Sequence, residues 1–231
     1  MDKRVELIAT AQAMSAIGLN RGTAGNLSCR QRHGDREGFL ITPTGMDYAR
    51  LKPGDIPWVG LDGRFSGDKN PSSEWRLHRD IYVARIEAGA VLHAHSPFAV
   101  SLACLRRDIP PFHYMIARFG GDDVRCAAYA LFGSQALSDA ALLALEDRSA
   151  CLLANHGMAV YGCDLKQALD RGVELETLCE HYWRASLLGE PALLEAEEMT
   201  AARERFQGYG GQGTEGSGSP RSAGRKNPGK E

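Results

Sequence analysis

The stretch AVLHAHSPF (residues 90–98) places two histidines one residue apart at the end of an apolar run. The run is typical of a buried β-strand, and Pro97 is typical of the first turn of a following helix. Successive side chains of a strand alternate between faces, so His93 and His95 are expected to point the same way. Two imidazoles directed at one point indicate a metal ion, since histidine is the commonest metal ligand. The alternative is two solvated histidines at a strand end, and further residues of the sequence are needed to distinguish it from a metal site.

A third histidine fits the same interpretation. A catalytic zinc site usually has three protein ligands and one open position. His156 follows the apolar run ACLLAN (residues 150–155) and precedes a glycine, so it is predicted at a strand end, where sheets present functional groups. The sequence therefore predicts a metal held by His93, His95 and His156. Three other histidines lie among charged neighbours and are expected at the surface or in packing roles: His33, His78 and His181.

Hydrophobic periodicity and turn residues divide the chain into alternating helices and strands. This mixture predicts an α/β protein with one sheet and helices on both of its faces. Residues 108–123 are expected to form a loop, and residues 156–162 are expected to continue the strand that precedes them. The predicted helices cover residues 3–17, 72–89, 97–107, 138–147, 165–188 and 195–206. The predicted strands cover residues 26–30, 38–42, 56–61, 88–94, 124–133 and 150–155.

Composition narrows the class of protein. The chain has 231 residues, 43% of them hydrophobic, and a formal net charge of −2. This is enough to bury a substantial core, and no basic excess indicates nucleic acid or an anionic membrane as partner. The N-terminal segment breaks its apolar residues with charges, unlike a signal peptide or a membrane span. The six cysteines form no C-x-x-C pair, so we expect reduced thiols and a cytoplasmic protein.

The C-terminal end differs from the rest. From Gln207 onward there are eight glycines in 25 residues and no Leu, Ile, Val, Met or Phe. Such a segment cannot bury enough surface to offset the entropy of ordering. We therefore expect one folded domain over residues 1–210 and a disordered glycine-rich tail over residues 211–231.

Three short loops and one carboxylate complete the candidate site. Glu74 stands in NPSSEW, a proline-led turn that enters a helix, where it is either an exposed capping residue or a general base. The same turn offers two serine hydroxyls and helix N-terminal amides, which favour an anion. The loops TPTG (residues 42–45) and GTAGN (residues 22–26) also combine small residues with hydroxyls. Together these loops predict a phosphate cradle that is unlike a P-loop.

Eight motifs in one order carry a family resemblance: NRGTAGNLS, LITPTG, PSSEWR, HAHSP, IPPFHYMIARFGG, CAAYALFG, NHG and FQGYG. In residues 3–210 the chain resembles the class II aldolase/adducin family. The resemblance implies a three-layer α/β fold around a mostly antiparallel sheet. It also implies one Zn²⁺ per subunit on His93, His95 and His156, Glu74 as acid/base, and a homotetramer with active sites at subunit interfaces.

Further roles are implied in the same way. Tyr114 would be a proton donor that reaches in from a neighbouring subunit. Three aromatic residues would line the aldehyde side: Phe132, Phe206 and Tyr209. The phosphate of a sugar substrate would be bound by Thr23, Gly25, Asn26, Thr44, Gly45, Ser72 and Ser73.

These features favour an aldolase that cleaves a ketose 1-phosphate into dihydroxyacetone phosphate and a short aldehyde. L-Fuculose 1-phosphate and 5-deoxy- or 5-methylthioribulose 1-phosphate are the candidate substrates. Ala94 between the histidines and Ser96 after them also resemble two other enzymes of the family, a pentulose 5-phosphate 4-epimerase and a methylthioribulose 1-phosphate dehydratase. A non-catalytic, adducin-like interaction module is the alternative outside enzymes, and the intact histidine set argues against it.

Overall fold

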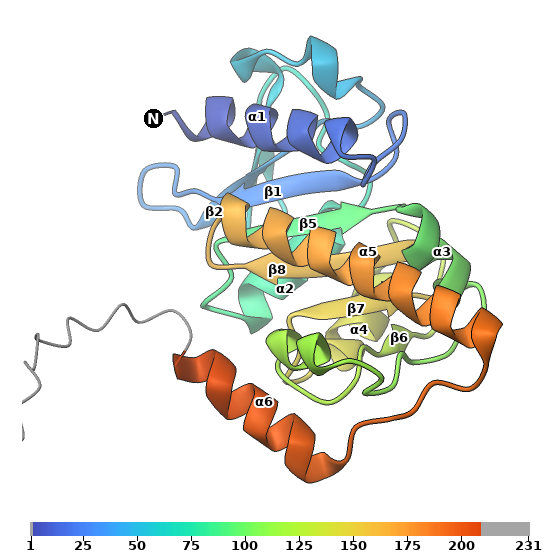
Figure 1. Ribbon diagram of the computed structural model, residues 1–231. Helices are drawn as coiled ribbons and strands as arrows, with labels where there is room; N and C mark the ends of the chain where they lie inside the picture. Colours follow the sequence, from blue (N-terminus) through green and yellow to red (C-terminus); the bar gives the residue numbers. More distant parts are fainter. Residues whose placement is uncertain (1, 209–231) are drawn as a thin grey trace, which may run out of the picture.

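The computed structural model describes residues 2–208, which form an eight-stranded sheet with the order β4-β3-β2-β1-β5-β8-β7-β6 (Figure 1). Every pair of neighbouring strands is antiparallel except β6 and β7. The strands are β1 Asn26–Arg30, β2 Gly38–Ile41, β3 Trp58–Gly60, β4 Phe65–Ser66, β5 Ala90–Ala94, β6 Cys126–Ala127, β7 Ala150–Leu153 and β8 Gly157–Gly162.

Within residues 2–208, six α-helices and three short 3₁₀ helices surround the sheet. The α-helices are α1 Lys3–Ala16, α2 Trp75–Ala84, α3 Pro97–Ala103, α4 Gln135–Ala144, α5 Leu165–Leu188 and α6 Ala196–Gly208. The 3₁₀ helices are η1 Tyr48–Arg50, η2 Pro53–Asp55 and η3 Tyr114–Phe119. No helix within residues 2–208 is long and apolar enough to cross a membrane.

The sheet separates two hydrophobic clusters, as alternation along its strands requires. On β5, Leu92 joins the cluster that contains residues of α1, α3 and α5, whereas Val91 joins the one that contains residues of α2 and α4. Figure 1 shows α5 lying across one face of the sheet and α1 beside it. The predicted α/β class, with one mostly antiparallel sheet and helices on both faces, is confirmed.

Side-chain caps set several helix boundaries. The long helix over residues 165–188 is found as predicted, and Asp164 caps it by accepting a hydrogen bond from the backbone N–H of Gln167. Helix α4 begins before the predicted residue 138, because Ser134 accepts from the N–H of Leu137 and so starts the helix earlier. All six cysteines are free, in agreement with the predicted reduced thiols.

Three expectations were wrong. The strand predicted over residues 124–133 shrinks to the two residues of β6, and the loop predicted over residues 108–123 contains η3. Residues 156–162 do not continue the preceding strand but fold back on it as β8, with Leu153 paired to Gly157. Asn155, His156 and Gly157 interrupt the apolar run at this point and were the available sign of the reversal. The predicted boundary at residue 210 and the tail over residues 211–231 lie outside the described residues.

Candidate metal centre

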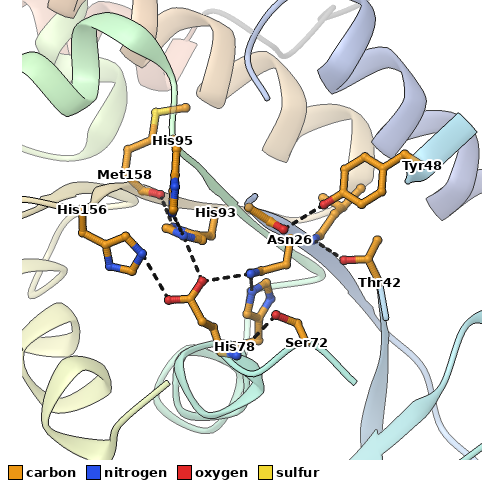
Figure 2. Close-up of polar contacts among 12 residues, drawn as sticks. Asn26, Thr42, Tyr48, Ser72, His78, His93, His95, His156 and Met158 are labelled. Atoms are coloured by element: carbon orange, nitrogen blue, oxygen red, sulfur yellow. Dashed lines mark hydrogen bonds and ion pairs between the residues drawn. The ribbon is translucent and has the colours of Figure 1, made fainter. Parts of the chain in front are cut away.

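Three imidazoles converge beside the end of β5 (Figure 2). The ring centroids of His93, His95 and His156 are 4.8–4.9 Å apart in every pair, and the rings are inclined to one another by 70–76°. The structure thus brings together the three histidines that the sequence singled out. Their separation in the chain is bridged by the antiparallel pairing of β5 with β8.

Hydrogen bonding orients the first of these rings. His93 is fully buried, and its Nδ1 lies 2.8 Å from the carbonyl oxygen of Met158 on β8. A carbonyl can only accept, so Nδ1 carries a proton and donates it. In the neutral ring, Nε2 then holds a lone pair, and it lies 3.0 Å from Nε2 of His95. A backbone carbonyl that fixes the tautomer in this way is typical of metal-binding histidines.

His156 comes from the three-residue turn between β7 and β8 rather than from a strand end. Asn155 adopts a left-handed conformation there, with φ of 53°, which asparagine tolerates better than most residues. The next residue must be small: a β-carbon on Gly157 would lie 2.4 Å from the carbonyl oxygen of Ala94 and 3.1 Å from Cδ2 of His95. Gly157 therefore lets the turn approach the end of β5 closely enough for the rings to meet.

Glu74 faces the three rings from the N-cap position, directly before the first residue of α2. Its Oε2 lies 3.0 Å from Nε2 of His93 and accepts a 3.0 Å hydrogen bond from Nδ2 of Asn26. Its Oε1 lies 3.4 Å from Nε2 of His156 and has no hydrogen-bond partner among the described residues. The side chain is buried and makes no capping bond. The alternative of an exposed capping glutamate is therefore wrong.

The pKa values of the cluster residues are shifted in different directions. Burial would lower the pKa of His93, but Glu74 raises it above its ordinary value. Burial and the nearby His93 lower the pKa values of His95 and His156 to about 4, so both rings are neutral at pH 7. Burial alone would raise the pKa of Glu74, but His93, His156 and Asn26 outweigh it and hold this pKa well below its ordinary value.

The donor set is that of a metal site. One ligand atom from each of the four residues lies within 4.8 Å of all the others. Three imidazole nitrogens and a carboxylate meet there, and the carboxylate oxygen Oε1 has no hydrogen-bond partner among the described residues. Three nitrogens and one oxygen suit zinc and related divalent ions, so these residues fit a metal.

Thr42 joins the three loops of the predicted phosphate site. Its Oγ1 accepts from the backbone N–H of Leu27, which follows the first loop. Its carbonyl oxygen accepts from the N–H of Ser72 in the turn before Glu74. The loops therefore lie side by side next to the metal cluster. Asn26 and Ser72 are buried, whereas four other predicted residues are exposed: Thr23, Thr44, Gly45 and Ser73. Phosphate binding by these residues remains a prediction.

Tyr48 supports the loop over residues 22–26, a role that the sequence did not predict. Its buried hydroxyl donates a 2.9 Å hydrogen bond to the carbonyl oxygen of Gly25. Gly25 has φ of +74°, and a β-carbon there would lie 2.7 Å from the carbonyl oxygen of His93. The loop thus needs glycine at this position for both conformation and space. A lone tyrosine after a turn gives no sequence signal for this contact.

His78 takes the second of the two roles expected for it, packing and not surface exposure. The side chain is fully buried, and both ring nitrogens are engaged in hydrogen bonds that the sequence did not predict. Nε2 lies 2.5 Å from Oδ1 of Asn26, and Nδ1 lies 2.7 Å from the hydroxyl of Ser28. Its spacing of four residues from Glu74 was the available signal, because residues i and i+4 share one face of a helix. His33 and His181 are exposed, as expected.

The aromatic residues assigned by resemblance make no ring contact with the three histidines among the described residues. Tyr114 is 53% exposed and stacks on Phe206, with ring centroids 6.2 Å apart and planes within 6°. None of its aromatic contacts involves the four cluster residues. Phe132 is exposed next to Gly133, where a β-carbon would lie 2.8 Å from the carbonyl oxygen of Ser73. Tyr209 lies outside the described residues.

This sheet, with its histidine and glutamate cluster, is that of a metal-binding α/β domain, and comparison defines the family. Residues 5–183 match the family described as Class II Aldolase and Adducin N-terminal domain, and the chain belongs to it. The resemblance found in the sequence is therefore confirmed. The motifs had placed the chain nearest to L-fuculose-1-phosphate aldolase within that family, and relatives of this kind are among those found.

Three relatives cover nearly the whole chain. It is 51% identical over 204 residues to the 5-methylthioribulose-1-phosphate/5-deoxyribulose-1-phosphate aldolase of Rhodospirillum rubrum, covering 88% of this chain and 90% of the relative. It is 40% identical over 206 residues to the L-fuculose phosphate aldolase of Escherichia coli K12, covering 89% and 94%. A solved structure titled L-fuculose 1-phosphate aldolase superimposes with a TM-score of 0.84 at 39% identity, covering 88% of this chain and 95% of that one.

Proposed function

We propose that the protein is a zinc-dependent aldolase that reversibly cleaves a ketose 1-phosphate into dihydroxyacetone phosphate and a short aldehyde. The substrates we favour are 5-methylthioribulose and 5-deoxyribulose 1-phosphate, with L-fuculose 1-phosphate as the next candidate. The order follows the identities of 51% and 40% to relatives that carry these names. The observation that carries the proposal is the meeting of Glu74 with His93, His95 and His156 on this family's fold.

Cleavage of a bond next to a carbonyl leaves negative charge on the departing enediolate. A divalent metal, when bound by the three histidines, supplies Lewis-acid stabilisation of that charge. The chain must also move two protons. One enters or leaves the carbon of dihydroxyacetone phosphate, and the other enters or leaves the hydroxyl of the aldehyde half.

Glu74 suits the proton transfer at carbon. Its low pKa keeps it ionised at neutral pH, so in the condensation direction it can take a proton from dihydroxyacetone phosphate. In the cleavage direction it returns that proton. The oxygen free for this task is Oε1, since Oε2 already accepts from Asn26.

The loops beside Glu74 would bind the phosphate end. Thr23, Thr44, Gly45 and Ser73 are exposed, so the three hydroxyls and the backbone N–H of Gly45 could hydrogen-bond to an anion, whereas the N–H of Thr44 already donates to the carbonyl oxygen of Asn70. Binding energy spent on the remote phosphate fixes the orientation of the reacting carbons.

Tyr114 would transfer the second proton from a neighbouring subunit. A phenol stays protonated at neutral pH, and the exposed ring of Tyr114 stands on η3, out of contact with the cluster of its own chain. We therefore infer a homotetramer whose active sites combine Glu74 of one subunit with Tyr114 of the next. Phe132 and Phe206 would line the aldehyde side.

The decisive experiment is an assay of the purified protein over a panel of ketose 1-phosphates, with every product identified. Dihydroxyacetone phosphate and an aldehyde are expected, and chelation should abolish their formation. Loss of water alone would indicate the dehydratase. Isomerisation of a pentulose 5-phosphate would indicate the epimerase. A protein that takes up no metal and turns over no sugar phosphate would indicate the adducin-like module.

A further inference from the structure

Two regular spacings face each other behind the cluster. Glu74, His78 and Tyr82 recur every four residues along α2, so they share one face of the helix. Asn26 and Ser28 are two residues apart on β1, so they share one face of the strand. Where these faces meet, five polar side chains form a continuous line, here called the polar ladder: Glu74, Asn26, His78, Ser28 and Tyr82.

Each step of the ladder is a short hydrogen bond. Asn26 lies 3.0 Å from Glu74 and 2.5 Å from His78. Ser28 lies 2.7 Å from His78 and 2.8 Å from the hydroxyl of Tyr82. All five side chains are buried, so water does not compete for these bonds. Figure 2 shows the His78 ring beneath Asn26.

The carboxylate at one end fixes the direction of every bond. An ionised Glu74 only accepts, so the Asn26 amide turns its N–H toward Oε2 and its Oδ1 toward His78. His78 must then carry its proton on Nε2 and accept at Nδ1 from the hydroxyl of Ser28. That hydroxyl in turn accepts from Tyr82. Burial lowers the pKa of His78 to about 3 and raises that of Tyr82, which keeps the imidazole neutral and the phenol protonated.

Two hydrogen bonds hold the Asn26 amide, one to Glu74 and one from His78. Without His78, the buried Oδ1 of Asn26 would lose its donor, and only the bond to Oε2 would orient the amide. An amide free to rotate about that single bond anchors Oε2 less firmly, so the carboxyl group could move away from its present position. The ladder thus holds Oε2 of Glu74 by a hydrogen bond and leaves Oε1 without one.

We propose that His78 is a positioning residue: through the Asn26 amide it fixes Oε2 of Glu74, so that Oε1 is the oxygen presented for proton transfer. The proposal rests on the function proposed above, in which Glu74 is the acid/base group. His78 itself touches neither the cluster nor a substrate.

Two substitutions at one position test the role. His78→Leu removes the donor but keeps an apolar volume in the core. His78→Gln keeps an amide N–H that can reach Oδ1 of Asn26. In the metal-loaded enzyme, we expect His78→Leu to lower kcat by about 10- to 100-fold, the range seen for residues that orient active-site ligands. KM and metal content should stay near wild type, and His78→Gln should recover most of kcat. His33→Leu, at an exposed histidine, is the control.

A double-mutant cycle separates positioning from general support of the fold. Deuterium exchange at the reacting carbon of dihydroxyacetone phosphate reports on Glu74 without the aldehyde. His78→Leu should slow this exchange in the wild-type background and change it less than twofold in the Glu74→Gln background. Equal losses in both backgrounds, or equal kcat for the Leu and Gln variants, would overturn the positioning role.

Failure of the underlying function has a different signature. If Glu74→Gln leaves the exchange rate unchanged, Glu74 is not the base and the proposed function fails first. If Glu74→Gln slows exchange but His78→Leu does not, only the role of His78 is wrong. Should His78→Leu not fold, Ser28→Ala serves instead, because it removes the donor that holds the His78 tautomer. It should lower kcat several-fold with unchanged KM, and an unchanged kcat would contradict the proposal.

Discussion

Asn26 on β1 lies directly opposite His93 on β5 in the antiparallel register. Opposed residues project from the same face of a sheet, so the amide and the imidazole both reach the Glu74 carboxylate that covers that face. A shift of the register by one residue would turn Asn26 to the other face and bring Leu27 into its place. The metal cluster and its anchor are therefore properties of sheet pairing as much as of the residues themselves.

His156→Ala should abolish tight metal binding while leaving the fold intact. The side chain comes from a turn and is only partly buried, so its removal leaves a small cavity but takes one of three nitrogen ligands away. The metal content of the purified variant, measured per chain, should fall from about one to near zero. His33→Ala is the matched control and should retain the metal. A fully loaded His156→Ala protein would remove this residue from the ligand set.

The stability of the metal-free protein should depend on pH through His78. The folded pKa is about 3, whereas the unfolded chain has the ordinary value of about 6.5. Below pH ~6.5 the unfolded chain gains a proton that the folded protein cannot bind. The free energy of unfolding therefore falls as pH falls, by ~1.4 kcal/mol per pH unit down to about pH 3, and His78 adds no pH dependence above pH ~6.5.

Urea denaturation of the wild type and of His78→Gln, both with chelator, should reveal this contribution. The difference between their free energies of unfolding should shrink by ~1.0 kcal/mol between pH 6.5 and pH 5.5, because the unfolded histidine is already half protonated at pH 6.5. Two curves that stay parallel over this range would show that His78 takes up a proton in the folded state as readily as in the unfolded one.

Local patterns predicted most of the fold and the centre of the site. His93 lies on the buried strand β5 and His95 directly follows its last residue, and the apolar periodicity of residues 165–188 predicted α5 to the residue. Asn155 and His156 interrupt the apolar run at residues 154–156, but two polar residues alone do not distinguish a chain reversal from a strand that continues. For His78, the charged sequence neighbours left both a surface and a packing role open. Only tertiary pairing with β1 shows that this face of α2 is polar and buried.

Gly157→Ala should destabilise the protein and weaken metal binding together. The added β-carbon would lie 2.4 Å from the carbonyl oxygen of Ala94, so β5 and β8 must separate, and His95 must move from His156. Overpacking of this kind costs about 1–3 kcal/mol. Thermal unfolding and chelator competition should both show the loss. Gly54→Ala is the control, because a β-carbon there meets no heavy atom within 4 Å. Unchanged metal affinity in Gly157→Ala would mean that the turn adapts without disturbing the rings.

Mixed oligomers of two inactive variants should regain activity. Tyr114→Phe removes the proposed phenolic donor, and Glu74→Gln removes the proposed base, so each variant alone should be nearly inactive. General acid or base groups commonly contribute about 10²- to 10⁴-fold. If Tyr114 acts in the neighbouring subunit's site, a mixed tetramer contains some interfaces where an intact Glu74 meets an intact Tyr114.

Joint unfolding and reassembly of the two variants tests this arrangement, with native mass spectrometry to verify that mixed species form. The activity expected is a sizeable fraction of wild type, limited by the share of interfaces that combine both intact residues. Reassembly of each variant with itself controls for changes caused by refolding. A third mixture, Glu74→Gln with the double variant Glu74→Gln/Tyr114→Phe, should stay inactive because no Glu74 is present.

If mixed tetramers form and activity remains at the level of the single variants, Tyr114 acts within its own chain or takes no part in the reaction. The 53% exposure of Tyr114 and its place on η3 favour the shared site, because an unshielded phenol in one subunit needs a second subunit to exclude water from it.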